Sequence, residues 1–131
     1  MIKYMLDTDI CSYIMREKPI EVLYRFESLE MEQVGISVIT YAEFMYGIAN
    51  SSNPKKHQQL IDSFVSHLDI LTWERQAAEH YGQIRISLKS EPIGSMDMLI
   101  AAHALSQDRI LVTNNIKHFS RVPELQIETW T

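Results

Sequence analysis

Residues 2–9 read Ile-Lys-Tyr-Met-Leu-Asp-Thr-Asp, a short and largely apolar run that closes on two carboxylates. The run from Ile2 to Leu6 predicts a first strand, and residues 8–16 have the pattern of a helix that follows it directly. Strands that alternate with helices are typical of βαβ units, whose strands are parallel. This opening therefore indicates an α/β fold, in which ligands bind at the carboxyl ends of the strands.

The rest of the chain repeats this alternation of short strands and amphipathic helices. Further strands are expected at residues 34–39, 69–73, 110–113 and 125–128, and further helices at 20–31, 40–49, 60–68, 74–89 and 96–106. Residues 50–56 are rich in Asn, Ser and Pro, which predicts a loop. We therefore expect a single three-layer α/β/α domain over residues 1–131, with a mostly parallel central sheet and helices on both faces.

Length and composition are those of one globular domain. Of 131 residues, 46% are hydrophobic and 22% charged, which excludes a disordered chain. The single cysteine excludes an internal disulfide and favours a reducing compartment. No apolar run is long enough to span a bilayer, and the N-terminus lacks a signal-peptide pattern, so we expect a cytoplasmic protein. The net charge of −5 argues against coating nucleic acid by bulk charge, but not against cutting it.

Acidic or amide residues stand just after several of the predicted strands. Asp7 and Asp9 follow the first strand, and Glu43 is expected in the first turn of the helix after the second. Asp97 opens a helix that is otherwise almost entirely apolar, and Asn115 follows the strand that ends near residue 113. Because the carboxyl ends of parallel strands share one edge of a sheet, these side chains are candidates for one common site.

Each of these residues also has a purely structural interpretation. Asp7 can cap the first helix, and the stretch Thr40–Glu43 has the form of a capping box. Ser95 can cap the apolar helix while Asp97 complements its dipole, and Asn115 can be a turn residue. A shared site explains the acids together, because carboxylates that converge without a counter-ion repel one another and have raised pKa values.

A divalent cation is the natural counter-charge for such a site. No Lys or Arg lies within three residues of Glu43 or Asp97. The candidate ligands Asp7, Glu43 and Asp97 offer hard oxygens, which suit Mg²⁺ or Mn²⁺ and disfavour zinc. Such an ion lowers the pKa of a bound water and shields the charge on a phosphate, so the pattern indicates phosphodiester hydrolysis. In this interpretation Glu43 assists the metal or the attacking water, and Asn115 orders the site.

Four segments occur in an order and spacing that resemble a known family. They are Leu6–Asp9, Ser37–Gly47, Pro92–Ala104, and Leu111–Asn115 followed by Phe119. Together they resemble PIN-domain proteins of the VapC toxin type over essentially the whole chain. The resemblance implies a Mg²⁺-dependent endoribonuclease of a type II toxin–antitoxin system.

The resemblance also assigns positions and partners. Asp7, Glu43 and Asp97 match the acidic metal-site residues of the family, and Asn115 stands where PIN domains often carry a fourth acid. Asp9 stands where the family usually has Asn, which adds a carboxylate. Family members are usually homodimers silenced by a VapB antitoxin, and similar toxins from enteric bacteria cut initiator tRNA in its anticodon loop. A homodimer, a VapB-like antitoxin and a tRNA substrate are therefore the implied partners.

Two other functions remain open at the level of sequence. A strand that ends in Asp7-Thr8-Asp9 also occurs in haloacid-dehalogenase-type phosphatases, where Asp7 would be a covalent nucleophile and Asp9 the general acid. That function also needs a catalytic Lys and an adjacent acidic pair, and this chain has no such pair and only a poorly placed Lys117. The other alternative is a non-catalytic binding module that kept the PIN fold.

The remaining polar residues give weaker signals. Arg85, Lys89, Lys117 and Arg121 are candidates for RNA contacts, with a solvated helix face as the alternative for each. His103 lies on the apolar helix and is expected to be a core histidine with satisfied hydrogen bonds.

Overall fold

A five-stranded sheet forms the centre of the computed structural model, which describes residues 1–131. The strands are β1 (Tyr4–Leu6), β2 (Val34–Ser37), β3 (Asp69–Leu71), β4 (Ile110–Val112) and β5 (Ile127–Glu128). Their order in the sheet is β3-β2-β1-β4-β5, and every neighbouring pair is parallel. The chain therefore places β2 and β3 on one side of β1, and it later places β4 and β5 on the other side of β1. The boundary between β1 and β4 is the switch point where such sheets open a crevice.

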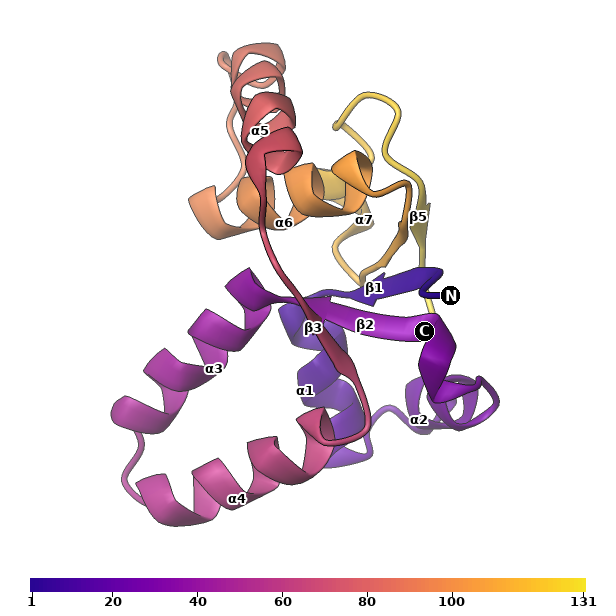
Figure 1. Cartoon of the computed structure of the whole chain (residues 1–131), viewed down its shortest axis with the longest axis vertical. Helices are drawn as coiled ribbons and strands as arrows, with labels where there is room; N and C mark the ends of the chain where they lie inside the picture. The colour runs from indigo at the N-terminus through magenta and orange to yellow at the C-terminus, as the bar shows by residue number, and fades with distance from the viewer.

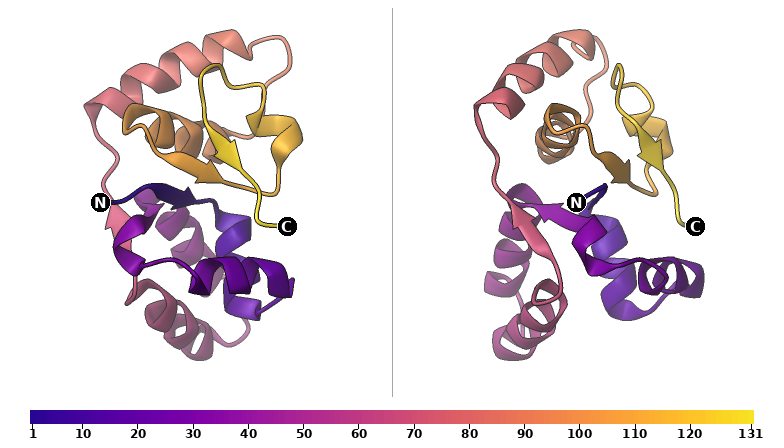
Figure 2. Two further views of the ribbon diagram at one scale, coloured as in Figure 1. Left: turned by 90° about the vertical axis from the view of Figure 1, so that its right-hand side faces the viewer. Right: turned by 45° about the vertical axis from the view of Figure 1, so that its right-hand side comes forward.

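Helices cover both faces of this sheet (Figures 1 and 2). One layer holds α1 (Thr8–Arg16), α2 (Ile20–Glu27), α3 (Val38–Ala49) and α4 (Pro54–Val65). The other holds α5 (Arg75–Ser87), α6 (Ser95–Ser106) and α7 (Ile116–Phe119), and a short 3₁₀ helix, η1 (Met31–Gln33), precedes β2. This arrangement confirms the predicted α/β/α fold with a parallel sheet. None of the helices combines the length and the apolar character that crossing a membrane requires.

Two separate cores hold the layers together, because alternate residues of each strand point to opposite faces. Tyr4 and Leu6 belong to the core under α1 to α4, whereas Met5 belongs to the core under α5 to α7. In the same way Val112 faces the first core and Leu111 the second. Strands that are buried on both faces give continuous apolar runs, which explains the character of residues 4–6 and 110–112.

Several strands and helices end or begin at other residues than predicted, because local hydrogen bonds set their boundaries. The strand expected at 34–39 ends at Ser37, and the helix expected from residue 40 begins at Val38. The reason is that Ser37 Oγ accepts a hydrogen bond from the backbone N–H of Ile39, at 3.0 Å, and so caps α3.

Other differences have equally local causes. The helix expected over residues 20–31 ends at Glu27, where the Ser28 hydroxyl donates to the carbonyl of Arg25. The loop expected over 50–56 is shorter, because Asn53 caps α4 and Pro54 is its first residue. Helix α7, of four residues, was not predicted, since so short an element has no apolar period.

Candidate active site

Asp7 stands at the switch point of the sheet and has two structural roles there. Its backbone N–H donates to the carbonyl of Val112 at 3.0 Å, which extends the pairing of β1 with β4. Its Oδ1 accepts from the backbone N–H of Ile10 at 2.9 Å and caps α1. The side chain is 5% exposed. The capping interpretation is therefore correct for Asp7, and it fixes where the carboxylate lies.

The environment of Asp7 disfavours its negative charge. Burial raises the pKa of this carboxyl from 3.8 to about 6. Hydrogen bonds from the side chain of Thr113 and from the Ile10 N–H lower the pKa, but they do not offset the burial. The nearby carboxylates of Asp9 and Asp97 raise it further. A cap alone does not require a buried acid in this position, because Asn caps a helix equally well.

Asp97 lies in the first turn of α6 and reaches the same edge of the sheet. The cap residue of α6 is Gly94, so Ser95 is the first residue of the helix rather than its cap. The Asp97 side chain is partly buried, and burial is the main cause of its raised pKa. The charge of His118 opposes this increase and the carboxylate of Asp9 adds to it. Asp7, Asp9 and Asp97 therefore form one electrostatically coupled group.

Glu43 enters the site from α3 through a contact with α1. Its Oε1 accepts a hydrogen bond from the hydroxyl of Thr8 at 2.6 Å. The same hydroxyl lies 3.3 Å from Oγ1 of Thr40. The capping-box prediction for Thr40–Glu43 is wrong, because Ser37 caps α3 and Glu43 lies in its second turn rather than its first. The Glu43 carboxylate is thus held toward the residue that follows Asp7.

Asn115 is positioned by the strand before it and by α7 after it. Its backbone N–H donates to Thr113 Oγ1 at 2.9 Å, and its Nδ2 lies 2.9 Å from Nδ1 of His118. No side-chain hydrogen bond from Asn115 caps α7. His118 was not among the predicted site residues, and the structure adds it through its contact with Asn115 and its charge near Asp97. In the sequence, the only signal for His118 is that it stands three residues after Asn115.

The donor set of this site fits a hard divalent cation. The one salt bridge of the structure joins Arg25 and Glu128, so no basic side chain pairs with these acids. Asp7 and Asp97 lie within electrostatic reach of each other, and Mg²⁺ typically binds one or two carboxylates together with water and phosphate. Glu43 does not join them in a ready three-residue cluster: no three His, Cys, Asp or Glu side chains are placed to hold a metal ion together.

Two residues outside the acidic group belong to the core, and for His103 this confirms the prediction. His103 is fully buried, and its Nδ1 lies 2.7 Å from Ser37 Oγ. Burial lowers the pKa of His103 from 6.5 to about 4, so the ring is neutral. Cys11 is also fully buried, on α1. Neither side chain belongs to the acidic group.

The sequence and the fold of this chain are similar to those of known proteins. Residues 4–125 match the family of the PIN domain. The chain is 41% identical to the tRNA(fMet)-specific endonuclease VapC of Shigella flexneri over the full length of both, and 40% identical to that of Salmonella typhimurium over 99% of each. The crystal structure of DNA-bound VapBC from Salmonella typhimurium superposes with a TM-score of 0.93 at 40% identity, covering 100% of each chain. VapBC2 from Rickettsia felis, bound to a promoter DNA fragment, gives a TM-score of 0.91 at 38% identity, also over 100% of each chain.

Proposed function

Because the chain belongs to the PIN-domain family, and within it to the VapC proteins, we propose that it is a Mg²⁺-dependent endoribonuclease and the toxin of a VapBC-type toxin–antitoxin system. The observation that carries this proposal is the coupled group of Asp7, Asp9 and Asp97 at the switch point. These carboxylates form no salt bridge, and burial disfavours the charge of Asp7 and Asp97, which favours a function that needs this charge.

In the proposed reaction water attacks the phosphorus of an RNA phosphodiester, the bond from phosphorus to one ribose oxygen breaks, and that oxygen takes a proton from solvent and leaves as a hydroxyl. Asp7 and Asp97 would hold Mg²⁺ or Mn²⁺, which when bound neutralises charge on the phosphate and lowers the pKa of water. Glu43 accepts the proton of the attacking water, because the hydroxyl of Thr8 occupies only its Oε1. Asn115 orders the site through Thr113 and His118.

The candidate substrate is initiator tRNA, and the candidate partner is a VapB-like antitoxin. The relatives from Shigella flexneri and Salmonella typhimurium are named tRNA(fMet)-specific endonucleases, which supports the substrate. The similar structures from Salmonella typhimurium and Rickettsia felis are VapBC assemblies, which supports the antitoxin. We also propose a homodimer, as the family resemblance implies, and a cytoplasmic location, as the sequence pattern predicts.

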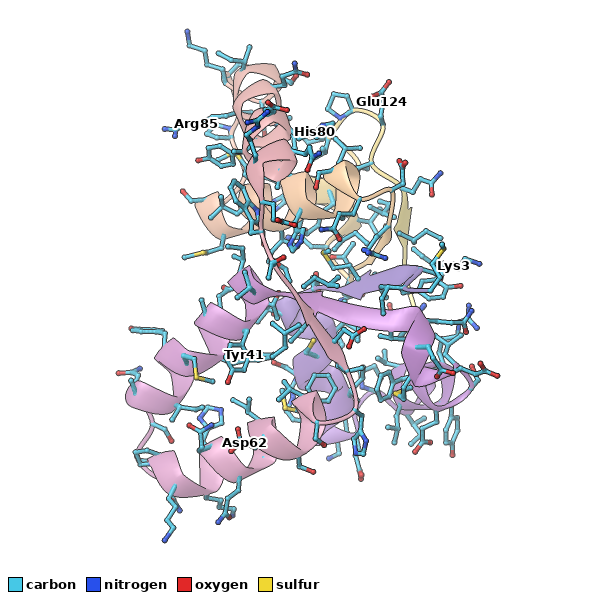
Figure 3. All side chains as sticks on the ribbon, in the orientation of Figure 1. Lys3, Tyr41, Asp62, His80, Arg85 and Glu124 are labelled. Atoms are coloured by element: carbon cyan, nitrogen blue, oxygen red, sulfur yellow. The ribbon has the colours of Figure 1, made fainter.

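The function is tested by comparing two Asp→Asn variants on tRNA(fMet) in the presence of Mg²⁺. Asp97→Asn should lower the cleavage rate by about a hundredfold or more, since even outer-shell changes cost metal sites ten- to a hundredfold. The matched control Asp62→Asn, exposed on α4 in the opposite layer, should cleave like the wild type (Figure 3). Gel analysis of the end-labelled tRNA measures the rate.

Other results of this assay would contradict the proposal. Cleavage that persists in EDTA would exclude the metal, and wild-type rates for Asp97→Asn would exclude this site. Glu43→Gln separates the nuclease from the phosphatase alternative, because only the nuclease loses activity. An elongator methionine tRNA cut at the same rate would overturn the initiator preference, whereas no cleavage of any RNA would favour the non-catalytic binding module.

A further inference from the structure

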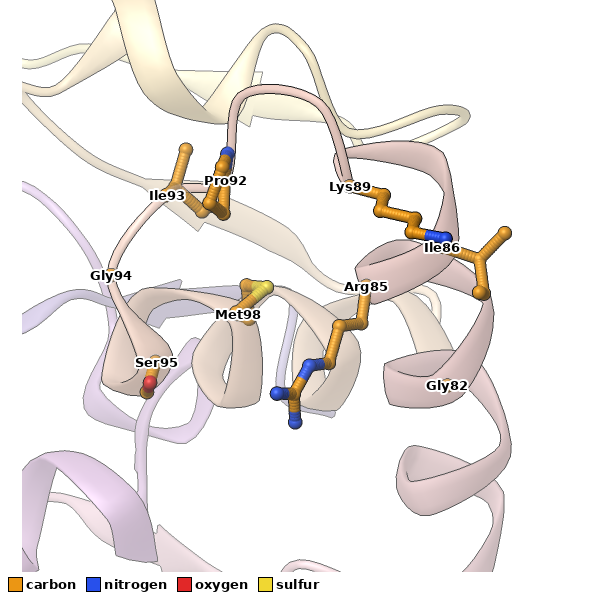
Figure 4. A pocket seen from close by; sticks show the side chains of 9 residues that line it. All are labelled: Gly82, Arg85, Ile86, Lys89, Pro92, Ile93, Gly94, Ser95 and Met98. Carbon is orange, nitrogen blue, oxygen red and sulfur yellow. The ribbon is translucent and has the colours of Figure 1, made fainter.

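A pocket lies between the C-terminal half of α5 and the beginning of α6, and its lining includes Arg85 and Lys89, two of the candidates for RNA contacts. Its volume is about 650 Å³, within the range of small-molecule sites. Figure 4 shows Arg85 extending from α5, Lys89 on the same helix with its amine beside Ile86, and Ile93 and Met98 on the side of α6. We call it the α5–α6 pocket, and Gly82, Ile86, Pro92, Gly94 and Ser95 complete its lining.

The α5–α6 pocket borders the acidic group directly. Gly94 lines the pocket, and a Cβ built on Gly94 would lie 3.9 Å from Oδ2 of Asp97. Met98, the residue after Asp97, forms part of the buried floor. A polymeric ligand that binds at Asp97 can therefore extend past Gly94 into the pocket.

The charge of the pocket is opposite to that of the protein as a whole. Arg85 and Lys89 are its only charged lining residues, while the chain carries a net charge of −5. Both are exposed, and Nη1 of Arg85 donates to the Tyr81 hydroxyl at 3.2 Å. In Figure 4 the Arg85 guanidinium extends from α5 toward α6. The connecting loop is also fixed, because Arg121 donates to the carbonyl of Glu91.

We propose that the α5–α6 pocket binds one nucleotide of the RNA strand next to the cleaved phosphate. This inference rests on the proposed function. Arg85 and Lys89 hold the phosphate of that nucleotide, and Ile93 and Met98 give its base or ribose an apolar surface. The acidic group repels an RNA backbone until its ion is bound, so a basic contact one nucleotide away positions the strand.

RNA fits this pocket better than an acidic protein segment does. A nucleotide combines a phosphate with a flat apolar face, and the pocket combines two basic side chains with a buried apolar floor. Its continuity with Asp97 ties its occupant to the strand being cut. Binding of the antitoxin there is the competing outcome of the test.

The test removes both charges of the pocket and compares the result with the same change elsewhere. Arg85→Gln/Lys89→Gln should raise the KM for tRNA about tenfold and leave kcat within about twofold, because the lost contacts lie beside the reacting phosphate. The control Lys55→Gln/Lys56→Gln changes the net charge equally on α4, in the other layer, and should leave KM unchanged. Thermal unfolding establishes that each variant is folded.

A second measurement does not depend on cleavage. In an Asp7→Asn background with EDTA, the pocket variant should bind tRNA about tenfold more weakly, with a reduced salt dependence, while its affinity for the antitoxin is unchanged. Ile86→Glu, at a residue 72% exposed, should weaken binding in the same way by placing an acid at the rim.

Four results would overturn the inference. Equal losses in the pocket and control variants would mean that only bulk charge matters. A loss of antitoxin affinity without a loss of RNA affinity would assign the pocket to the antitoxin. Unchanged KM and affinity in a chain that cleaves tRNA would remove the pocket but leave the nuclease intact, whereas a wild type that neither cleaves nor binds RNA would remove both.

Discussion

Helix α6 carries two polar side chains that meet the ends of neighbouring strands, and the two pairs they form have opposite character. His103 meets Ser37, at the end of β2, in a buried hydrogen bond of 2.7 Å. The charge of Asp97 acts on Asp7, just after β1, and as a like charge it raises the pKa of Asp7. The first pair satisfies its polar groups within the protein, whereas the second brings two negative charges together without a salt bridge to either. The difference indicates which pair serves the fold and which serves a ligand.

The two pairs also respond to pH in opposite directions. The pKa of Asp7 is raised to about 6, so its contribution to stability is present below pH 3.8 and lost as the pH rises through about 6. The pKa of His103 is lowered to about 4, so its contribution is present above pH 6.5 and lost as the pH falls through about 4. Between about pH 6 and pH 4, lowering the pH therefore stabilises the protein through Asp7 and destabilises it through His103.

The largest effect is expected from Asp7→Asn, which removes the charge and keeps the helix cap. Cleavage should fall about a hundredfold or more, while the free energy of unfolding at pH 7 rises by up to about 3 kcal/mol, the cost of the raised pKa. Urea unfolding in EDTA at pH 7 and pH 4 measures this, and the gain should be absent at pH 4. A variant less stable than the wild type at pH 7 would mean that the Asp7 charge serves the fold.

A smaller and purely structural effect is expected from Ser37→Ala. The change removes the cap of α3 and leaves His103 Nδ1 without its partner, so the free energy of unfolding should fall by about 2 kcal/mol. Cleavage by the folded protein should change little. Ser63→Ala, exposed on α4, is the matched control for chemical unfolding. A strong loss of activity in folded Ser37→Ala would contradict the separation of the two pairs.

The smallest effect is expected from Thr8→Val. Thr8 follows Asp7 on α1, and its hydroxyl holds the carboxylate of Glu43 on α3. Without the Thr8 hydroxyl the Glu43 carboxylate loses its 2.6 Å hydrogen bond, and kcat should fall about threefold with little change in stability. Single-turnover cleavage measures kcat for this variant and for Thr129→Val, an exposed control near the C-terminus. An unchanged kcat would remove the positioning role of Thr8.

The candidate site was predictable where a residue follows directly from a strand or opens a helix. Asp7 was placed correctly because β1 and α1 are contiguous, and Asp97 because it opens the apolar α6. The contact of Glu43 with Thr8 was not predictable, because it joins residues 35 apart through the packing of α1 on α3. His118 was missed because α7 is too short to leave a pattern.

By itself the sequence determined the alternation of strands and helices, the parallel sheet and the family resemblance, because these depend on local periodicity and on the order of motifs. Only the tertiary structure decided which polar groups are paired and which are not. Burial and the distances between side chains set the pKa values of Asp7 and His103, and both depend on elements that are distant in the chain.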